Sequence, residues 1–436
     1  MRVALYTLGC KVNSYETDRI REAFVKKGAQ IVPFTEPADV YVVNTCTVTQ
    51  MAAKKSRQIL HRARRLTPDA LIVATGCYVD GCAGEAPEGV DLMIGNQDKE
   101  RLVEIVEEAA LGRTLLETEQ SEEESGSGHT RAFLKVQDGC RQFCSYCIIP
   151  YVRGPLVSKE PEEVVSEALR MAQEGYREIV LTGIHLSSYG RKGTLKDPER
   201  SETLGSLICS LNQIDGIDRI RLGSLEPGLI TEAYLDEVRQ ADKLCPHYHL
   251  SLQSGCARTL KSMNRHYTPE EYLAAVELLR GQWPDTAVTT DLIVGFPGET
   301  EEDFQESLEF LKKVGFSQVH VFKYSKRAGT AAAKRPEQVS EEVKHERSER
   351  AIALATELSE RFAEQYVGTA REVLIEERCE DGWVGYTNHY IRTLVENDPR
   401  IHENRIVKVQ MKKTVRKDGE IYLTGVIADG SEYKIL

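Results

Sequence analysis

Short strand-like runs that alternate with helical stretches restrict the fold of this chain more than any other feature. Between residues 130 and 330 six such runs recur, at 133–136, 178–182, 219–222, 248–252, 288–294 and 319–324. This alternation is typical of βα units that build a parallel sheet. Because a complete TIM barrel has eight units, we expect a partial (β/α)6 TIM-like barrel at residues 130–336 and an overall α/β class.

The residues before the barrel predict a second, smaller α/β domain. Strand-like runs at 3–8, 40–43 and 71–74 alternate with helical stretches, which indicates a small parallel sheet within residues 1–116. Residues 117–129 are acidic, rich in Ser and Gly and without an apolar period, so we expect a solvated linker.

The residues after the barrel change character. Residues 337–366 have the pattern of a long charged connecting helix. In residues 367–436, strand-like runs alternate with Gly and Asn/Asp turns, which predicts a small all-β barrel.

Composition limits the cellular setting and the role of the cysteines. Neither a secretion signal nor an apolar run of membrane-spanning length is found, so we expect a cytoplasmic protein without a membrane partner. The net charge of −12 implies that any contact with nucleic acid comes from local basic patches. In a reducing compartment, spaced cysteines favour metal ligation or catalysis over disulfides. The 11 cysteines therefore need a chemical explanation.

Cys140, Cys144 and Cys147 form a CxxxCxxC pattern directly after the first barrel strand. Chemistry gathers at the carboxyl ends of barrel strands, so three thiolates are expected to converge there on one inorganic centre. A structural zinc site needs four ligands, for which only His129 is at hand, and unrelated buried thiols are the other alternative. Three thiolates on a four-iron cluster leave one iron open to another ligand.

Cys10, Cys46 and Cys77 form a second set that topology brings together. They follow the three strands of the first domain, in TLGC, VNTC and ATGC. Carboxyl ends of parallel strands border a shared crevice, although three separate buried thiols would also fit. The other cysteines show no such placement and are interpreted as structural: Cys82, Cys209, Cys245, Cys256 and Cys379.

These motifs resemble one family. GCKVN, the triplet Cys10, Cys46 and Cys77, and GCRQFCSYCIIPYVRG look like the methylthiotransferase branch of the radical S-adenosylmethionine enzymes. Its three groups act on isopentenyl-adenosine in tRNA, on threonylcarbamoyl-adenosine in tRNA, or on an aspartate of a ribosomal protein. GCKVN, GIHLSSYG and TNHYIRTLVEN look closest to the threonylcarbamoyl-adenosine group.

The resemblance implies two [4Fe–4S] clusters. Cys140, Cys144 and Cys147 would hold the cluster whose open iron binds and cleaves S-adenosylmethionine, while Cys10, Cys46 and Cys77 would hold an auxiliary cluster carrying the transferred sulfur. A second S-adenosylmethionine would supply the methyl group. Further expected contacts of S-adenosylmethionine, for each of which a structural role is the alternative, are Tyr146, Gly183, Ser224, Gln253, Arg265 and Gly295.

The resemblance also implies partners. Two basic segments, residues 52–65 and 407–417, are candidates for contact with a tRNA anticodon stem-loop, and a TRAM-like RNA-binding barrel would carry the second. Ordinary solvated surface is the alternative for both. An electron donor such as flavodoxin or ferredoxin and a sulfur donor would also be needed.

The expected reaction is methylthiolation at C2 of N6-threonylcarbamoyladenosine 37, next to the anticodon. The hydrogen on this aromatic carbon is not acidic enough for base catalysis, which calls for a radical route. The alternatives are isopentenyladenosine 37, a ribosomal-protein aspartate, or a non-catalytic iron–sulfur electron carrier or RNA-binding protein.

Overall fold

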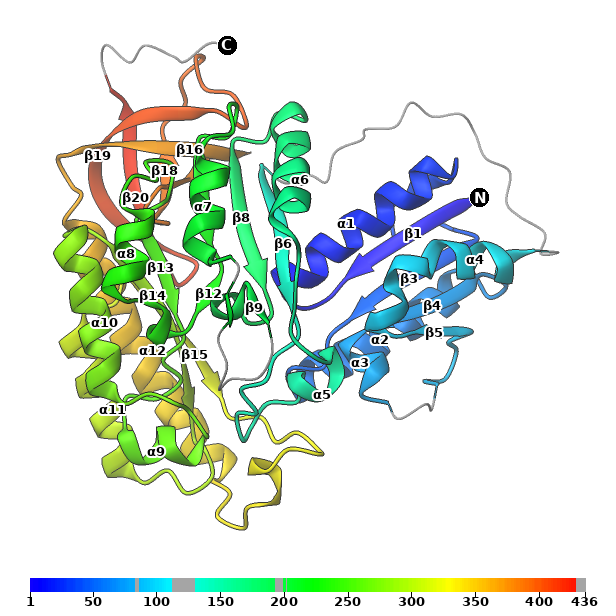
Figure 1. Cartoon of the computed structure of the whole chain (residues 1–436), viewed down its shortest axis with the longest axis horizontal. Coiled ribbons are helices and arrows are strands. Elements are labelled where there is room, and N and C mark those ends of the chain that lie inside the picture. The colour runs from blue at the N-terminus through cyan, green and yellow to red at the C-terminus, as the bar shows by residue number, and fades with distance from the viewer. Residues whose placement is uncertain (83–85, 112–129, 193–198, 201, 429–436) are drawn as a thin grey trace. The chain divides into compact units, whose positions relative to one another are not determined.

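The computed structural model describes residues 1–82, 86–111, 130–192, 199–200 and 202–428, so the expected linker at 117–129 lies outside the described residues (Figure 1). The chain divides into two compact units. Unit 1 comprises Met1–Gly128, Asp138–Val157 and Ser325–Lys334, and unit 2 comprises His129–Gln137, Ser158–Tyr324 and Arg335–Leu436. No helix in the described ranges is long and apolar enough to cross a membrane. The expected domain boundaries stay predictions.

Unit 1 contains a parallel sheet in the order β2-β1-β3-β4-β5. Its strands are β1 (Arg2–Thr7), β2 (Gln30–Val32), β3 (Val40–Thr45), β4 (Leu71–Gly76) and β5 (Leu92–Ile94). The parallel sheet was predicted. The two edge strands were missed, because three residues are too few to show a period.

Helices cover both faces of this sheet. They are α1 (Lys11–Lys26), α2 (Gln50–Leu66), α3 (Cys77–Asp80), the 3-10 helix η1 (Asn96–Arg101) and α4 (Leu102–Ala110). Val40 and Val42 share a core with α1 and α4, whereas Tyr41 and Val43 share a core with α2. Because successive side chains point to opposite faces, β3 is buried throughout and reads as a continuous apolar run.

Two inserted segments complete unit 1. Asp138–Val157 carries α5 (Ile149–Arg153), and Ser325–Lys334 carries a short 3-10 helix, η4 (Ala332–Lys334). The amide of Ala332 donates to the carbonyl of Ser145 at 2.7 Å. The side chain of Gln50, at the start of α2, donates to the carbonyl of Lys326 at 2.9 Å. The two segments therefore touch each other and the N-terminal sheet domain.

Unit 2 contains the predicted (β/α) alternation, in two sheets of order β11-β8-β6-β7 and β12-β13-β14-β15. The strands pair in parallel from β11 to β6 and throughout the second sheet. The six predicted runs correspond to β6 (Arg131–Asp138), β8 (Glu178–Gly183), β11 (Arg219–Leu222), β13 (His247–Leu250), β14 (Ala287–Val294) and β15 (Gln318–Lys323). Four short strands accompany them: β7 (Val157–Ser158), β9 (Arg191–Lys192), β10 (Glu199–Arg200) and β12 (Ser224–Leu225). The α/β class and the central barrel-like arrangement are confirmed.

Helices follow most of these strands. They are α6 (Pro161–Gln173), α7 (Leu204–Asn212), α8 (Glu232–Val238), α9 (Ala257–Ser262), α10 (Pro269–Gln282) and α11 (Glu301–Val314). Threonine side chains cap four of them, α7, α8, α10 and α11. Thr268 and Thr300 form capping boxes at the starts of α10 and α11, satisfying backbone N–H groups that the helices leave unpaired.

The long helix α12 (Glu341–Glu364) leads into the C-terminal β region (Figure 1). A closed barrel of order β16-β17-β18-β20-β19 follows. Its strands are β16 (Ala370–Cys379), β17 (Gly382–Thr387), β18 (Arg392–Val395), β19 (Ile406–Lys417) and β20 (Glu420–Ile427). Phe362 and Tyr366 at the end of α12 join the barrel core, so the predicted all-β region is packed onto the helix before it.

Candidate cluster sites

Cys10, Cys46 and Cys77 each stand at or just beyond the carboxyl end of a strand of the N-terminal sheet. Cys10 caps α1, Cys46 follows β3 directly, and Cys77 begins α3 after β4. Burial raises the pKa of the Cys46 thiol, and the thiols of Cys77 and Cys10 raise it further. Because β1, β3 and β4 are neighbouring parallel strands, their carboxyl ends bring the three cysteines to the same edge of the sheet.

Two glycines allow this close approach. Gly9, at φ +109°, would carry its Cβ 3.1 Å from the Cys46 sulfur. Gly76, at φ +97°, would carry its Cβ 2.6 Å from both Asn44 Oδ1 and the Thr45 carbonyl oxygen. Both positions combine a left-handed backbone with a lack of space, so only glycine fits without rearrangement.

Asn13, the last residue of GCKVN, ties the strand ends together. Its Nδ2 donates to the carbonyl oxygens of Leu8 at 2.7 Å and Thr45 at 3.1 Å. Its Oδ1 lies 4.0 Å from the Cys10 sulfur. Asn13 is 1% exposed, and its role as a connector explains why a polar side chain is buried at this point.

Arg153 brings a buried cation to the same place. Its Nε donates to the Cys77 sulfur at 3.1 Å, and its terminal nitrogens donate to Asn13 Oδ1 at 2.6 Å and Glu16 Oε1 at 2.5 Å. Lys99 in turn donates to Glu16 and, at 3.1 Å, to Asn44 Oδ1. Burial raises the pKa of Cys77, whereas Arg153 and Lys99 lower it by favouring the thiolate.

The CxxxCxxC segment is a loop between β6 and α5, and its first residues lie against the residues that follow α5. Gly139, at φ +72°, would carry its Cβ 1.8 Å from the carbonyl oxygen of Pro155, so no larger residue fits. Cys144 is buried, and Cys140 and Cys147 are half-buried. The amide of Cys147 donates to the carbonyl of Cys144 at 2.9 Å, which forms the turn that the CxxC spacing allows. Tyr146, on this turn, is half-buried.

The donor chemistry of both triads fits iron–sulfur clusters. Thiolates are the ligands that such clusters use, and a cluster held by three of them keeps one iron for a further ligand. Arg153 and Lys99 supply positive charge beside Cys77, which offsets the negative charge of thiolate ligands in a buried place.

The other expected S-adenosylmethionine contacts lie in unit 2, most of them near strand ends and Arg265 between α9 and α10. Gly183 ends β8, where a Cβ would lie 3.0 Å from the side chain of Gln137. Ser224 begins β12 and is exposed. Gln253 has φ +68°, and its amide donates to the carbonyl of Asp291 at 2.9 Å. A left-handed glutamine is uncommon and marks a locally constrained backbone.

Arg265 and Gly295 already have partners in the protein. Arg265 Nη2 donates to both oxygens of Glu226, at 2.7 and 2.6 Å, and its guanidinium lies 4.9 Å from the Tyr267 ring centre. The amide of Gly295 donates to Glu299 Oε2 at 2.6 Å. None of these contacts tests ligand binding, so the five unit 2 residues and Tyr146 stay predictions.

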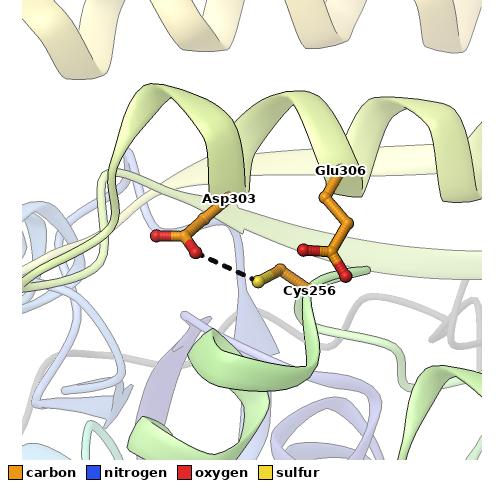
Figure 2. Close-up of side chains that lie close together, drawn as sticks. All are labelled: Cys256, Asp303 and Glu306. Carbon is orange, nitrogen blue, oxygen red and sulfur yellow. Dashed lines mark hydrogen bonds between the residues drawn. The ribbon is translucent and has the colours of Figure 1, made fainter.

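Cys256, Asp303 and Glu306 form a separate group whose ligand atoms lie within 4.8 Å of one another (Figure 2). The Cys256 thiol donates to Asp303 Oδ1 at 3.2 Å, and burial raises its pKa to about 11. Asp303 also accepts from the Thr300 amide at 2.7 Å in the capping box of α11. A protonated thiol is a poor ligand and nucleophile, which agrees with the structural interpretation of Cys256, and that interpretation stays a prediction.

Sequence reasoning missed the polar partners of the first triad. Arg153, Glu16, Lys99 and Asn44 come from four separated segments, and only their fold brings them together. The sequence did mark two of the polar residues around this triad. Asn13 lies in GCKVN and Arg153 lies in YVRG, and both segments belong to the motifs that carry the family resemblance.

Two parts of the chain match known protein families. Residues 134–311 match the radical SAM superfamily, and residues 2–95 match a family described as uncharacterized protein family UPF0004. The first match contains the Cys140 triad, and the second contains Cys10, Cys46 and Cys77.

Curated relatives match over most of the chain. The threonylcarbamoyladenosine tRNA methylthiotransferase MtaB of Bacillus subtilis is 40% identical over 98% of this chain and 97% of its own length. The enzyme of the same name from Aquifex aeolicus is 40% identical over 86% of this chain and 93% of its own length. The tRNA-2-methylthio-N(6)-dimethylallyladenosine synthase of Thermoanaerobacter pseudethanolicus is 36% identical over 85% of this chain and 81% of its own length.

Solved structures share the fold. The radical S-adenosylmethionine methyltransferase TsrM of Kitasatospora setae, with cobalamin and a [4Fe–4S] cluster bound, has a TM-score of 0.56 at 17% identity, covering 76% of this chain and 77% of its own. The cobalamin-dependent S-adenosylmethionine radical enzyme OxsB has a TM-score of 0.50 at 11% identity, covering 76% of this chain and 54% of its own. At these identities the likeness concerns the fold alone.

Proposed function

The chain belongs to the family of radical S-adenosylmethionine tRNA methylthiotransferases, and from this premise we propose that its substrate is N6-threonylcarbamoyladenosine at position 37 of tRNA. The observation that carries the proposal is the match to threonylcarbamoyladenosine enzymes at 40% identity over 98% of this chain. GCKVN, which resembles the same group, supports it. The product is the 2-methylthio derivative.

The enzyme uses S-adenosylmethionine and iron–sulfur chemistry, and we propose two [4Fe–4S] clusters. The Cys140, Cys144 and Cys147 loop holds the cluster that binds S-adenosylmethionine, and Cys10, Cys46 and Cys77 hold the auxiliary cluster. When bound, these groups supply a one-electron route to substitution at an aromatic carbon that acid–base catalysis does not activate.

The protein's own residues prepare the auxiliary site. Gly9 and Gly76 keep space open beside Cys46 and Asn44, and Asn13 fixes two strand ends. Arg153 offsets charge at Cys77. Tyr146 and the unit 2 residues Gly183, Ser224, Gln253, Arg265 and Gly295 are proposed to contact S-adenosylmethionine.

Helix α2 is the proposed contact for tRNA phosphates. Ala53, Leu60 and Ala63 face the core of the sheet domain, whereas Lys54 and Lys55 are exposed. The exposed side also carries Arg57, Arg62 and Arg65. Because Cys46 lies four residues before α2, phosphates on this face would keep the anticodon loop near the auxiliary site.

The C-terminal barrel offers a second contact. Lys408, Lys412 and Lys413 on β19 are exposed, whereas Arg416 and Lys417 pair with Glu360 and Asp381 at 3.1 and 2.7 Å. We propose that the exposed lysines contribute to RNA binding.

Further partners follow from the chemistry. An electron donor such as flavodoxin or ferredoxin would reduce the clusters, and a sulfur donor would restore the transferred sulfur. We propose that the enzyme works in the cytoplasm, where its tRNA substrate is found.

Nucleoside analysis of tRNA by mass spectrometry tests the substrate. In a strain lacking this gene, 2-methylthio-threonylcarbamoyladenosine should disappear while its unmethylthiolated precursor accumulates. Loss of only the isopentenyl derivative would contradict the proposal and support the corresponding alternative. Unchanged tRNA would instead favour a ribosomal-protein aspartate as the target.

Iron analysis and complementation test the cluster assignment. The reconstituted protein should bind about eight irons, and replacing either cysteine triad by alanine should leave about four. Cys379→Ala is the matched control, because Cys379 lies on β16 outside both triads and should leave iron content and complementation unchanged. Loss of iron in the control, or full iron content without a triad, would contradict the assignment.

A further inference from the structure

We infer that Arg153 is a positioning residue of the auxiliary site that hydrogen-bonds the Cys77 ligand and raises the reduction potential of the cluster held there. The inference rests on the proposed function, because it takes Cys10, Cys46 and Cys77 as cluster ligands. It concerns this chain's own side chain and how that side chain tunes one ligand sulfur.

Side chains of the protein itself hold Arg153 in place. Its side chain is 0% exposed, and its Nε lies 3.1 Å from the Cys77 sulfur. The terminal nitrogens are held by Asn13 Oδ1 at 2.6 Å and Glu16 Oε1 at 2.5 Å, with Asp138 Oδ2 at 3.3 Å from Nη1. Because the planar guanidinium is held on its other edges, its Nε–H remains directed at the sulfur.

The sign of the effect follows from charge. Reduction adds one negative charge to the cluster, and a cation that donates a hydrogen bond to a ligand sulfur stabilises the reduced form more than the oxidised form. Arg153 therefore raises the potential. Glu16, which accepts from both Arg153 and Lys99, opposes this effect by neutralising part of their charge.

Arg153 also joins the two cysteine sets within unit 1. It ends α5, six residues after Cys147, and so belongs to the same segment as the Cys140 triad. Its bond to Cys77 attaches that segment to a ligand of the other triad. Asn96 adds a second attachment, since its Nδ2 donates to the carbonyl of Val152 at 3.1 Å.

A redox titration followed by EPR spectroscopy of the reconstituted full-length protein tests the inference. S-adenosylhomocysteine is added as a probe, because it has no sulfonium to cleave and marks the cluster of the Cys140 triad by changing its signal. At a fixed potential, Arg153→Gln should lower the reduced-to-oxidised ratio of the other cluster about tenfold, which corresponds to about 59 mV for one electron.

Two further variants make the test independent of folding. Glu16→Gln should shift the ratio upward, because it keeps the Arg153 bond and removes an opposing charge. Arg153→Lys should restore part of the loss. Simple destabilisation does not shift the reduced-to-oxidised ratio in opposite directions at two neighbouring buried residues. If Arg153→Gln fails to load the auxiliary cluster, the ratios measured for Glu16→Gln and Arg153→Lys test the inference instead.

Arg221→Gln is the matched control. Arg221 is an equally buried arginine in unit 2 that pairs with Glu178, so the change should lower stability and leave the cluster ratio unchanged. An unchanged ratio in both Arg153→Gln and Glu16→Gln would overturn the inference. Failure of the proposed function looks different: the wild-type protein would then bind only about four irons and show no second signal.

Discussion

Glu178 provides the sharpest test of what holds unit 2 together. This carboxylate begins β8, and its side chain is 0% exposed. Arg221 donates to both of its oxygens, at 2.6 and 3.1 Å, and Arg219 lies 3.9 Å away. The same arginines donate to carbonyl oxygens of the C-terminal barrel, at Tyr386 and Asn388, each at 3.0 Å.

Glu178→Gln keeps the shape of the side chain and removes its charge. Two buried guanidinium groups then lose their anion, and breaking a buried ion pair in this way costs about 3–5 kcal/mol of unfolding free energy. The paired replacement Glu178→Gln with Arg221→Met removes most of the uncompensated charge. It should therefore recover more than half of the loss, because most of that loss comes from buried positive charge left without a counter-ion.

Urea unfolding followed by tryptophan fluorescence measures these changes. Trp283 follows α10 and Trp383 lies on β17, so single-tryptophan variants report separately on the barrel-like domain and the C-terminal barrel. Both reporters should shift in Glu178→Gln, since Arg221 bonds both regions. The arginine charges hold the pKa of Glu178 below its ordinary value.

The pH dependence follows from that depressed pKa. The unfolded chain binds the proton of Glu178 more tightly than the folded chain, so wild-type stability should fall as the pH drops below the ordinary pKa of 4.5. The glutamine variant should lack this part of the dependence. The reasoning would be refuted if the shift of the urea midpoint in Glu178→Gln corresponded to less than about 0.5 kcal/mol of unfolding free energy. It would also be refuted if the double variant were less stable than Glu178→Gln alone.

Three further predictions concern other sites. Burial raises the pKa of Glu299 to about 7, so the folded state binds this proton more tightly than the unfolded state. Wild-type stability should therefore fall as pH rises from about 4.5 to 7, and Glu299→Gln should flatten that trend in urea midpoints. A trend of opposite sign would count against burial as the cause. Gly76→Ala should destabilise the N-terminal domain by about 1–3 kcal/mol and reduce the amount of bound iron. The control Gly28→Ala, also at positive φ but with no neighbour within 4 Å, should leave bound iron unchanged. Equal iron content in the two variants would contradict the argument from crowding at Gly76. Charge reversal of Lys54 and Lys55 should weaken tRNA binding in filter-binding titrations. The slope of the logarithm of the binding constant against the logarithm of salt concentration should fall in magnitude by about 2. An unchanged slope would show that α2 does not contact the tRNA.

Local pattern was enough to predict the order of domains and the position of the cysteines. Strand and helix periods depend on near neighbours in sequence, so the six barrel runs and the parallel N-terminal sheet were predictable. The three-residue strands β2 and β5 fell below the length at which a period is visible. The placement of Cys10, Cys46 and Cys77 after three strands followed from the same local reasoning.

Only the tertiary structure decided which polar groups surround those cysteines. Arg153 and Cys77 are 76 residues apart, and Arg153 and Glu16 are 137 residues apart. A sequence period carries no information on such pairs, because the partner of a buried charge is chosen by the packing that brings distant segments together. The sequence by itself therefore indicated the candidate cysteine ligands, and the fold determined the charge and hydrogen bonds around them.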